Sequence, residues 1–109
     1  MAEIKELTKA IVSFIQERDW EQFHNPKDTA LGLFIEASEL NEAFLWKKDN
    51  EADINKIKEE LADVIIYALD LARQYNLDVT EIVLNKIKRN AEKYPIEKCM
   101  GSAKKYTEL

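Results

Sequence analysis

The chain has 109 residues, of which 46% are hydrophobic and 34% charged, a composition typical of one globular domain and not of a disordered protein. Its net charge of −5 disfavours nucleic acid as a partner, because a phosphate backbone is bound by a basic surface. No apolar run approaches the roughly 18 residues of a membrane span, and the N-terminal residues lack the apolar stretch of a signal peptide, so we expect a cytoplasmic protein that binds no membrane.

Apolar residues recur every three or four positions in four segments, which predicts four helices. The first helix begins near Ile4 and fades at residues 18–20. The second begins at a capping residue, Asp28 or Thr29, and extends to about Trp46.

The third helix is expected to start near Asp53 and to end at about Tyr75. The fourth has the clearest start, because Asp78 followed by Glu81 resembles a capping box. Pro95 stops this helix.

These elements make the protein all-α, a four-helix bundle-type subunit. We expect residues 1–95 to form its helical domain and residues 96–109 to form a basic, extended or partly mobile tail of the same domain. A chain of this size buries about two-thirds of its surface, which supports one modest core but no deep internal cavity. A substantial active site is therefore expected to lie between subunits.

Several common chemistries are excluded by single residue types. The lone Cys99 cannot form an intrachain disulfide, and the lone His24 cannot build a multi-histidine metal site. Two glycines are too few for a phosphate-binding glycine-rich loop. The charge is uneven, with −9 over residues 1–84 and +4 over residues 85–109. Such a chain is suited to holding a cation and a polyphosphate together.

Two pairs of carboxylates lie beside the apolar stripes of the second and third helices. They are Glu36 with Glu39 and Glu60 with Asp63, each pair spaced so that it occupies adjoining turns of one helix face. If the two helices pack antiparallel, four acidic groups converge.

Four converging carboxylates need compensation, because they repel one another and lose hydration when buried. They can protonate, pair with lysine or arginine, or bind a divalent cation. Ligands that are all oxygen suit Mg²⁺, with Mn²⁺ as a substitute. The competing interpretation is a solvated acidic face on a non-catalytic helical dimerisation or interaction module. Glu36 and Glu60 favour the metal site, because they fall within the apolar arc of their helices.

The sequence also resembles a known family, the MazG-like all-α nucleotide pyrophosphohydrolases, and within it the dCTP pyrophosphatase branch. The resemblance covers about residues 7–109. It rests on ERDWEQFH at residues 17–24, the acidic pair of the second helix with Trp46, EELADVIIY at residues 59–67, Lys86, Asn90, Tyr94-Pro95 and the terminal KYTEL.

The resemblance implies cleavage of a nucleoside triphosphate to the monophosphate and pyrophosphate, as in the cleansing of nucleotide pools. It implies a homodimer or a homotetramer, a dimer of dimers, with sites between subunits. It also implies residue roles. The expected Mg²⁺ ligands are Glu36, Glu39, Glu60 and Asp63, and the expected nucleotide-binding residues are Trp20, Trp46, Tyr67, Lys86 and Asn90.

Two further expectations concern the reaction. A Mg²⁺-bound water is expected to attack the α-phosphorus, and Glu39 to accept its proton, because Glu39 lies farthest from the apolar arc. Tyr94 continues the polar stripe formed by Lys86 and Asn90 at four-residue steps, and is added to the nucleotide-binding set.

The base preference stays open at this point. Ile11 stands where dCTP-selective relatives have a histidine, so the substrate is dCTP, a modified nucleotide or another deoxynucleotide. A related all-α pyrophosphatase acting on dUTP or phosphoribosyl-ATP is the alternative within the same fold.

Overall fold

The computed structural model describes residues 2–108, and all the regular structure in this range is helical. The all-α prediction is confirmed. The four predicted segments correspond to four long helices, and a fifth, short helix follows them. Their bounds are α1 (Ala2–Glu17), α2 (Pro26–Glu42), α3 (Ile54–Gln74), α4 (Val79–Lys93) and α5 (Ile96–Cys99). The chain divides into two compact units, the first ending at Leu77 and the second beginning at Asp78.

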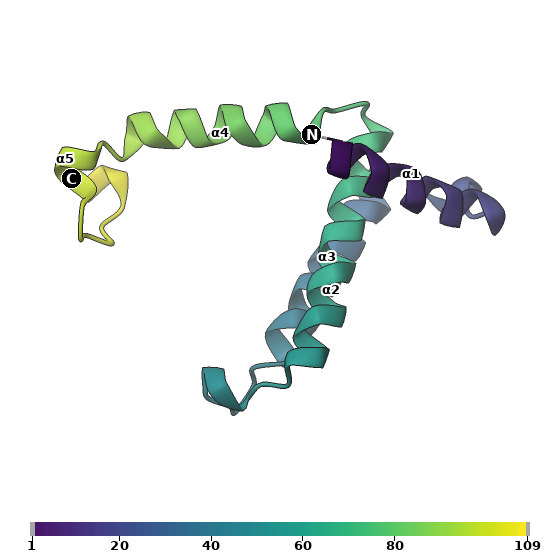
Figure 1. The fold of residues 1–109 in the computed structure, drawn as a ribbon, viewed down its shortest axis with the longest axis horizontal. Helices are drawn as coiled ribbons and strands as arrows, with labels where there is room; N and C mark the ends of the chain where they lie inside the picture. The colour runs from purple at the N-terminus through teal and green to yellow at the C-terminus, as the bar shows by residue number, and fades with distance from the viewer. Residues whose placement is uncertain (1, 109) are drawn as a thin grey trace. The chain divides into compact units, whose positions relative to one another are not determined.

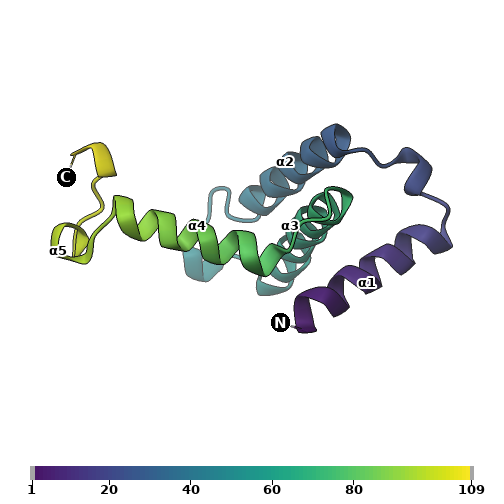
Figure 2. The same cartoon turned by 90° about the horizontal axis from the view of Figure 1, so that it is seen from above.

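The antiparallel pair of α2 and α3 is the centre of the first unit (Figures 1 and 2). The two helices approach closely at Gly32, where a Cβ atom would lie only 2.3 Å from Tyr67 Cε1. Glycine is therefore required here by space, since its backbone conformation is ordinary helix. This close approach lets the Tyr67 ring lie against the backbone of α2.

Helix α1 packs on α3 and supplies the other side of the small core. Ile15 of α1 and Leu69 of α3 are buried. The chain leaves α1 through Asp19 in a left-handed conformation (φ 54°), which turns Trp20 back toward the helix. The ring centroids of Trp20 and Phe14 lie 5.7 Å apart in an edge-to-face arrangement that favours aromatic pairs.

The start of α2 differs from the prediction. Asn25, rather than Asp28 or Thr29, is the N-cap, and its side chain accepts a 3.0 Å hydrogen bond from the backbone N–H of Asp28. The reason is Pro26, which disfavours helical geometry at the preceding residue and is itself well suited to the first helical position. Thr29 is buried inside the first turns of the helix.

The end of α2 also differs, because the helix stops at Glu42 and not near Trp46. The next residues form a run of tight turns, in which Phe44 N–H donates to Asn41 O at 3.1 Å and Leu45 N–H to Glu42 O at 3.1 Å. Trp46 then adopts a left-handed conformation with φ 63°, which ends any helical path. The predicted start of α3 near Asp53 and the predicted N-cap Asp78 of α4 are confirmed, and Asp53 is also an N-cap.

The second unit holds α4 and a tail that is partly helical. The sequence predicts an extended or partly mobile tail over residues 96–109, yet residues 96–99 form α5 and a 3₁₀ turn follows at Tyr106–Glu108. Pro95 explains this helix, because its fixed φ (−61°) suits a helix start. Across residues 2–108 none of the helices combines the length and the apolar character needed to cross a membrane.

Candidate functional site

The acidic cluster, defined as Glu36, Glu60 and Asp63, lies where α2 faces α3. Ligand atoms from these three carboxylates all lie within 4.8 Å of one another. Glu36 comes from α2, and the other two come from successive turns of α3. The antiparallel packing of the two helices therefore brings together side chains that are 24 residues or more apart in sequence.

The carboxylates of this cluster are poorly compensated. Glu36 Oε2 and Glu60 Oε2 are buried and have no hydrogen-bond partner among the described residues. Burial raises the pKa of Glu36, and the neighbouring Glu39, through a side-chain hydrogen bond and its charge, raises it further. Asp63 and Glu60 add smaller repulsive contributions to the same pKa. Glu39 thus lies close enough to act on the cluster electrostatically.

Lys56 provides a local positive charge one turn before Glu60 on α3. Its Nζ donates to Glu60 Oε1 at 2.9 Å. This hydrogen bond lowers the pKa of Glu60 and raises the pKa of Lys56. One ammonium group cannot neutralise three or four carboxylates, so the site keeps a negative excess.

The residues of the cluster fit a hard divalent cation. All the candidate ligands are carboxylate oxygens, which Mg²⁺ and Mn²⁺ prefer. Glu36 Oε2 and Glu60 Oε2 are buried without a hydrogen-bond donor, and each of these carboxylates offers an oxygen within 4.8 Å of the other ligand atoms. A divalent cation would supply the missing partner for both oxygens and would offset the repulsion.

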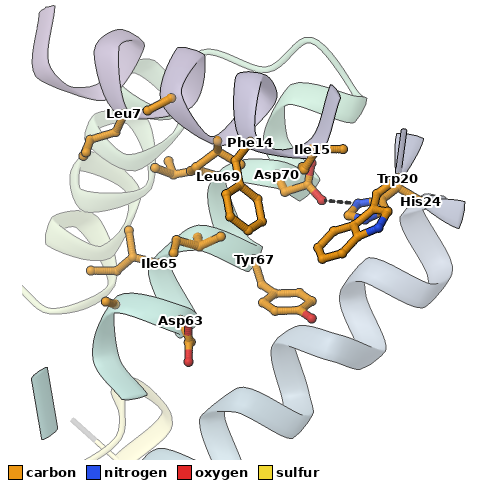
Figure 3. A pocket seen from close by; sticks show the side chains of 14 residues that line it. Leu7, Phe14, Ile15, Trp20, His24, Asp63, Ile65, Tyr67, Leu69 and Asp70 are labelled. Atoms are coloured by element: carbon orange, nitrogen blue, oxygen red, sulfur yellow. Dashed lines mark hydrogen bonds and ion pairs between the residues drawn. The ribbon is translucent and has the colours of Figure 1, made fainter. Parts of the chain in front are cut away.

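A pocket of about 690 Å³ lies between α1 and α3 and is lined mainly by apolar side chains (Figure 3). Trp20 and Tyr67 present aromatic rings to it, and Asp63 lies at its edge. Asp63 also belongs to the acidic cluster, so the cavity and the cluster adjoin. Ile11 forms part of the apolar wall.

Tyr67 connects the pocket with the cluster. Burial raises the pKa of its phenol, and the negative charges of Glu36 and Asp63 raise it further. The phenol is therefore neutral at physiological pH, with a hydroxyl that can donate a hydrogen bond as well as accept one.

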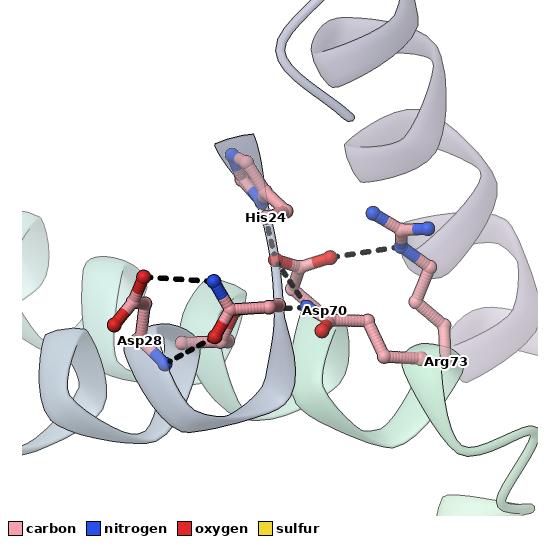
Figure 4. Close-up of polar contacts among 7 residues, drawn as sticks. His24, Asp28, Asp70 and Arg73 are labelled. Atoms are coloured by element: carbon pink, nitrogen blue, oxygen red, sulfur yellow. Dashed lines mark hydrogen bonds and ion pairs between the residues drawn. The ribbon is translucent and has the colours of Figure 1, made fainter. Parts of the chain in front are cut away.

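A second polar group, absent from the sequence-based prediction, surrounds Asp70 at the pocket (Figure 4). The Asp70 side chain is 4% exposed and accepts from Arg73 Nε at 2.8 Å, while His24 Nδ1 lies 3.0 Å from its other oxygen. Gln74 Nε2 donates to Thr29 Oγ1 at 2.8 Å and reaches the same carboxylate at 3.3 Å. This network ties the start of α2 to the end of α3.

The remaining predicted site residues lie elsewhere. Trp46 is 98% exposed and does not line the pocket. Lys86, Asn90 and Tyr94 belong to the second unit and are exposed, the first two on α4 and Tyr94 at its C-cap. Their roles in nucleotide binding stay predictions.

The sequence model of the MazG-like family matches residues 33–109. The dCTP pyrophosphatase 1 of Mus musculus is 38% identical over 114 residues, which covers 97% of this chain and 67% of the mouse protein. The dCTP pyrophosphatase 1 of Homo sapiens matches with the same identity and coverage. The crystal structure of a pyrophosphatase from Archaeoglobus fulgidus is similar with a TM-score of 0.79 and 33% identity, covering 85% of this chain and 93% of that one.

The chain therefore belongs to the MazG-like family, and the resemblance drawn from the sequence is confirmed. It is an enzyme of the nucleoside triphosphate diphosphatase class. This result disfavours the alternative of a non-catalytic interaction module.

Proposed function

We propose that the protein is a Mg²⁺-dependent pyrophosphohydrolase that cleaves deoxynucleoside triphosphates, dCTP or modified deoxynucleotides among them, and so cleanses the nucleotide pool of the cytoplasm. The main support for this proposal is that Asp63 belongs to the acidic cluster and also lines the pocket. The apolar, aromatic cavity therefore lies directly beside a cluster of poorly compensated carboxylates. A nucleotide needs both environments at once, because its base is flat and apolar on its faces and its phosphates are bound with a cation.

The cation would be held by Glu36, Glu60 and Asp63, with Glu39 beside them. When bound, Mg²⁺ or Mn²⁺ supplies charge neutralisation for the phosphates and makes water a stronger nucleophile. Glu39 accepts the proton of the water that attacks the α-phosphorus, and pyrophosphate leaves. The enzyme's own contribution is to fix these carboxylates on two packed helices, which limits their reorganisation during the reaction.

The base is expected to lie in the cavity against Trp20 and Tyr67, where stacking on an aromatic ring is worth about 1–3 kcal/mol. Ile11 offers no hydrogen bond to a base, so this wall of the pocket can distinguish one base from another only by shape. We therefore expect a preference for deoxynucleotides with moderate selectivity among bases. Phosphate and sugar contacts are assigned to Lys86, Asn90 and Tyr94.

We also propose that the active form is a homodimer or a homotetramer. Large apolar side chains are exposed on the isolated chain, among them Leu31, Phe34, Leu84, Ile87 and Ile96. Large exposed apolar side chains, present on each of the two units, are suited to burial at subunit interfaces.

The test is pyrophosphate release from a panel of canonical and modified nucleoside and deoxynucleoside triphosphates, each with Mg²⁺ and with EDTA. We expect turnover that requires Mg²⁺ and that Glu39→Gln abolishes, while the helical circular dichroism is unchanged. Glu42→Gln, one turn further along α2, is the matched control and is expected to keep activity. Full activity of Glu39→Gln would refute the assignment of the base. Turnover confined to dUTP or phosphoribosyl-ATP would instead identify the protein as a related all-α pyrophosphatase with a different substrate.

A further inference from the structure

The ion pair between Lys56 and Glu60 stands at the edge of the proposed metal site, and its two partners are in different environments. The Glu60 side chain is 8% exposed, whereas the Lys56 side chain is 52% exposed. Glu60 is therefore fixed within the helix pair, while Lys56 is a flexible chain whose ammonium group can exchange between the carboxylate and solvent. Glu60 therefore stays in the site, whereas the ammonium group of Lys56 can leave it.

The two oxygens of Glu60 are used unequally. Oε1 accepts from Lys56 Nζ at 2.9 Å. Oε2 is buried without a partner, and the Glu60 carboxylate takes part in the group of ligand atoms that lie within 4.8 Å of one another. The ammonium group thus satisfies Oε1 of this cluster carboxylate and leaves Oε2 without a hydrogen-bond partner.

We propose that Lys56 is a resident counter-ion of the acidic cluster, which a divalent cation displaces from Glu60 when it binds. The inference rests on the proposed function, because it requires that the cluster bind a divalent cation. An ammonium group hydrogen-bonded to a ligand carboxylate repels a divalent ion placed among the same carboxylates. A unit positive charge about 5 Å from a divalent ion lowers its binding roughly tenfold even in surroundings as polar as water. Lys56 therefore stabilises the metal-free site and weakens metal binding at the same time.

The test compares Lys56→Met with Lys58→Met. The second variant removes the same charge from an exposed position of α3 that makes no ion pair within residues 2–108. Mn²⁺ binding is measured by calorimetry on the whole chain, and thermal unfolding is followed in EDTA and in excess Mn²⁺. We expect Lys56→Met to bind Mn²⁺ about five- to tenfold more tightly than the wild type. We also expect Lys56→Met to unfold at a lower temperature than the wild type in EDTA. Its melting temperature should rise more than that of the wild type when Mn²⁺ is added. Lys58→Met should stay within twofold of the wild type, and Lys56→Arg, which keeps the charge, should resemble the wild type.

The possible failures are distinguishable. Wild-type protein that binds Mn²⁺ and releases pyrophosphate, but whose Mn²⁺ affinity is unchanged or lowered by Lys56→Met, would overturn the counter-ion proposal alone. Wild-type protein that shows neither Mn²⁺ binding nor Mg²⁺-dependent turnover would overturn the proposed function, and the counter-ion proposal with it.

Discussion

The contact between Gly32 and Tyr67 gives a sharp test of how the helix pair positions the site. In Gly32→Ala the new Cβ would lie 2.3 Å from Tyr67 Cε1, 2.8 Å from Cδ1 and 3.2 Å from Cζ. Favourable carbon–carbon contacts need about 3.5–4.0 Å, so the ring must retreat by roughly 1 Å. Overpacking of this kind costs about 1–3 kcal/mol. Alanine recovers roughly 0.5–1 kcal/mol over glycine in a helix interior. We expect a net loss of about 1–2 kcal/mol.

The sign of the effect should reverse when the ring is removed. In a Tyr67→Ala background nothing from the ring opposes the new Cβ, and Gly32→Ala should stabilise the protein by roughly 0.5–1 kcal/mol. Urea unfolding followed by far-UV circular dichroism measures all four proteins of this cycle. Because Tyr67 lines the pocket, the single variant should also raise the KM for the nucleotide. A Gly32→Ala effect of the same sign and size in both backgrounds would refute the assigned close contact.

Two further predictions concern the polar groups near the pocket. Asp70→Ala should lower the free energy of unfolding by about 2–4 kcal/mol in urea titrations, because His24, Arg73 and Gln74 lose their shared acceptor; a loss below about 1 kcal/mol would contradict a structural role for the network. The Tyr67 phenol should ionise above its ordinary pKa of 10.0. The difference in phenolate absorbance between wild type and Tyr67→Phe measures this pKa. Since the folded state favours the neutral phenol, the stabilising contribution of Tyr67 is complete below pH 10. This contribution decreases as the pH rises through the folded-state pKa. Ionisation of Tyr67 at or below pH 10 would contradict the argument that burial raises its pKa.

Local signals in the sequence were sufficient for most of the helices. The third helix begins after Asp53 and the fourth is capped by Asp78, as predicted, because an acceptor side chain directly before a periodic apolar segment favours a helix start. The start of α2 offered several acceptors within five residues. Asn25 is the N-cap because Pro26 restricts the backbone of the residue before it to non-helical conformations. Capping propensity alone could not make that choice.

The approach of the carboxylates could be predicted from helix periodicity once the two helices were assumed antiparallel. The surroundings of Asp70 could not be predicted, because they depend on contacts between distant residues. His24 is 46 positions from Asp70, and Thr29 is 45 positions from Gln74, which in turn contacts Asp70. The available signal was an aspartate between two leucines in an otherwise apolar turn of α3. Trp46 was placed on a helix by its apolar neighbours, whereas its backbone lies in a left-handed turn that periodicity does not detect.

The acidic cluster illustrates why function and stability are opposed in this chain. Glu36 and Glu60 occupy positions on the facing sides of α2 and α3 where apolar side chains would pack without electrostatic penalty. Only a few apolar side chains are buried among residues 2–108, so the penalty falls on a protomer with little core to offset it. In the structure the opposing contribution comes from Lys56 at the edge of the cluster. In the proposed active form, a cation among the carboxylates and burial of exposed apolar side chains in an assembly would add to it. If the proposed cation and subunit contacts form, they stabilise the fold as well as the site, because each binds the folded chain and not the unfolded one.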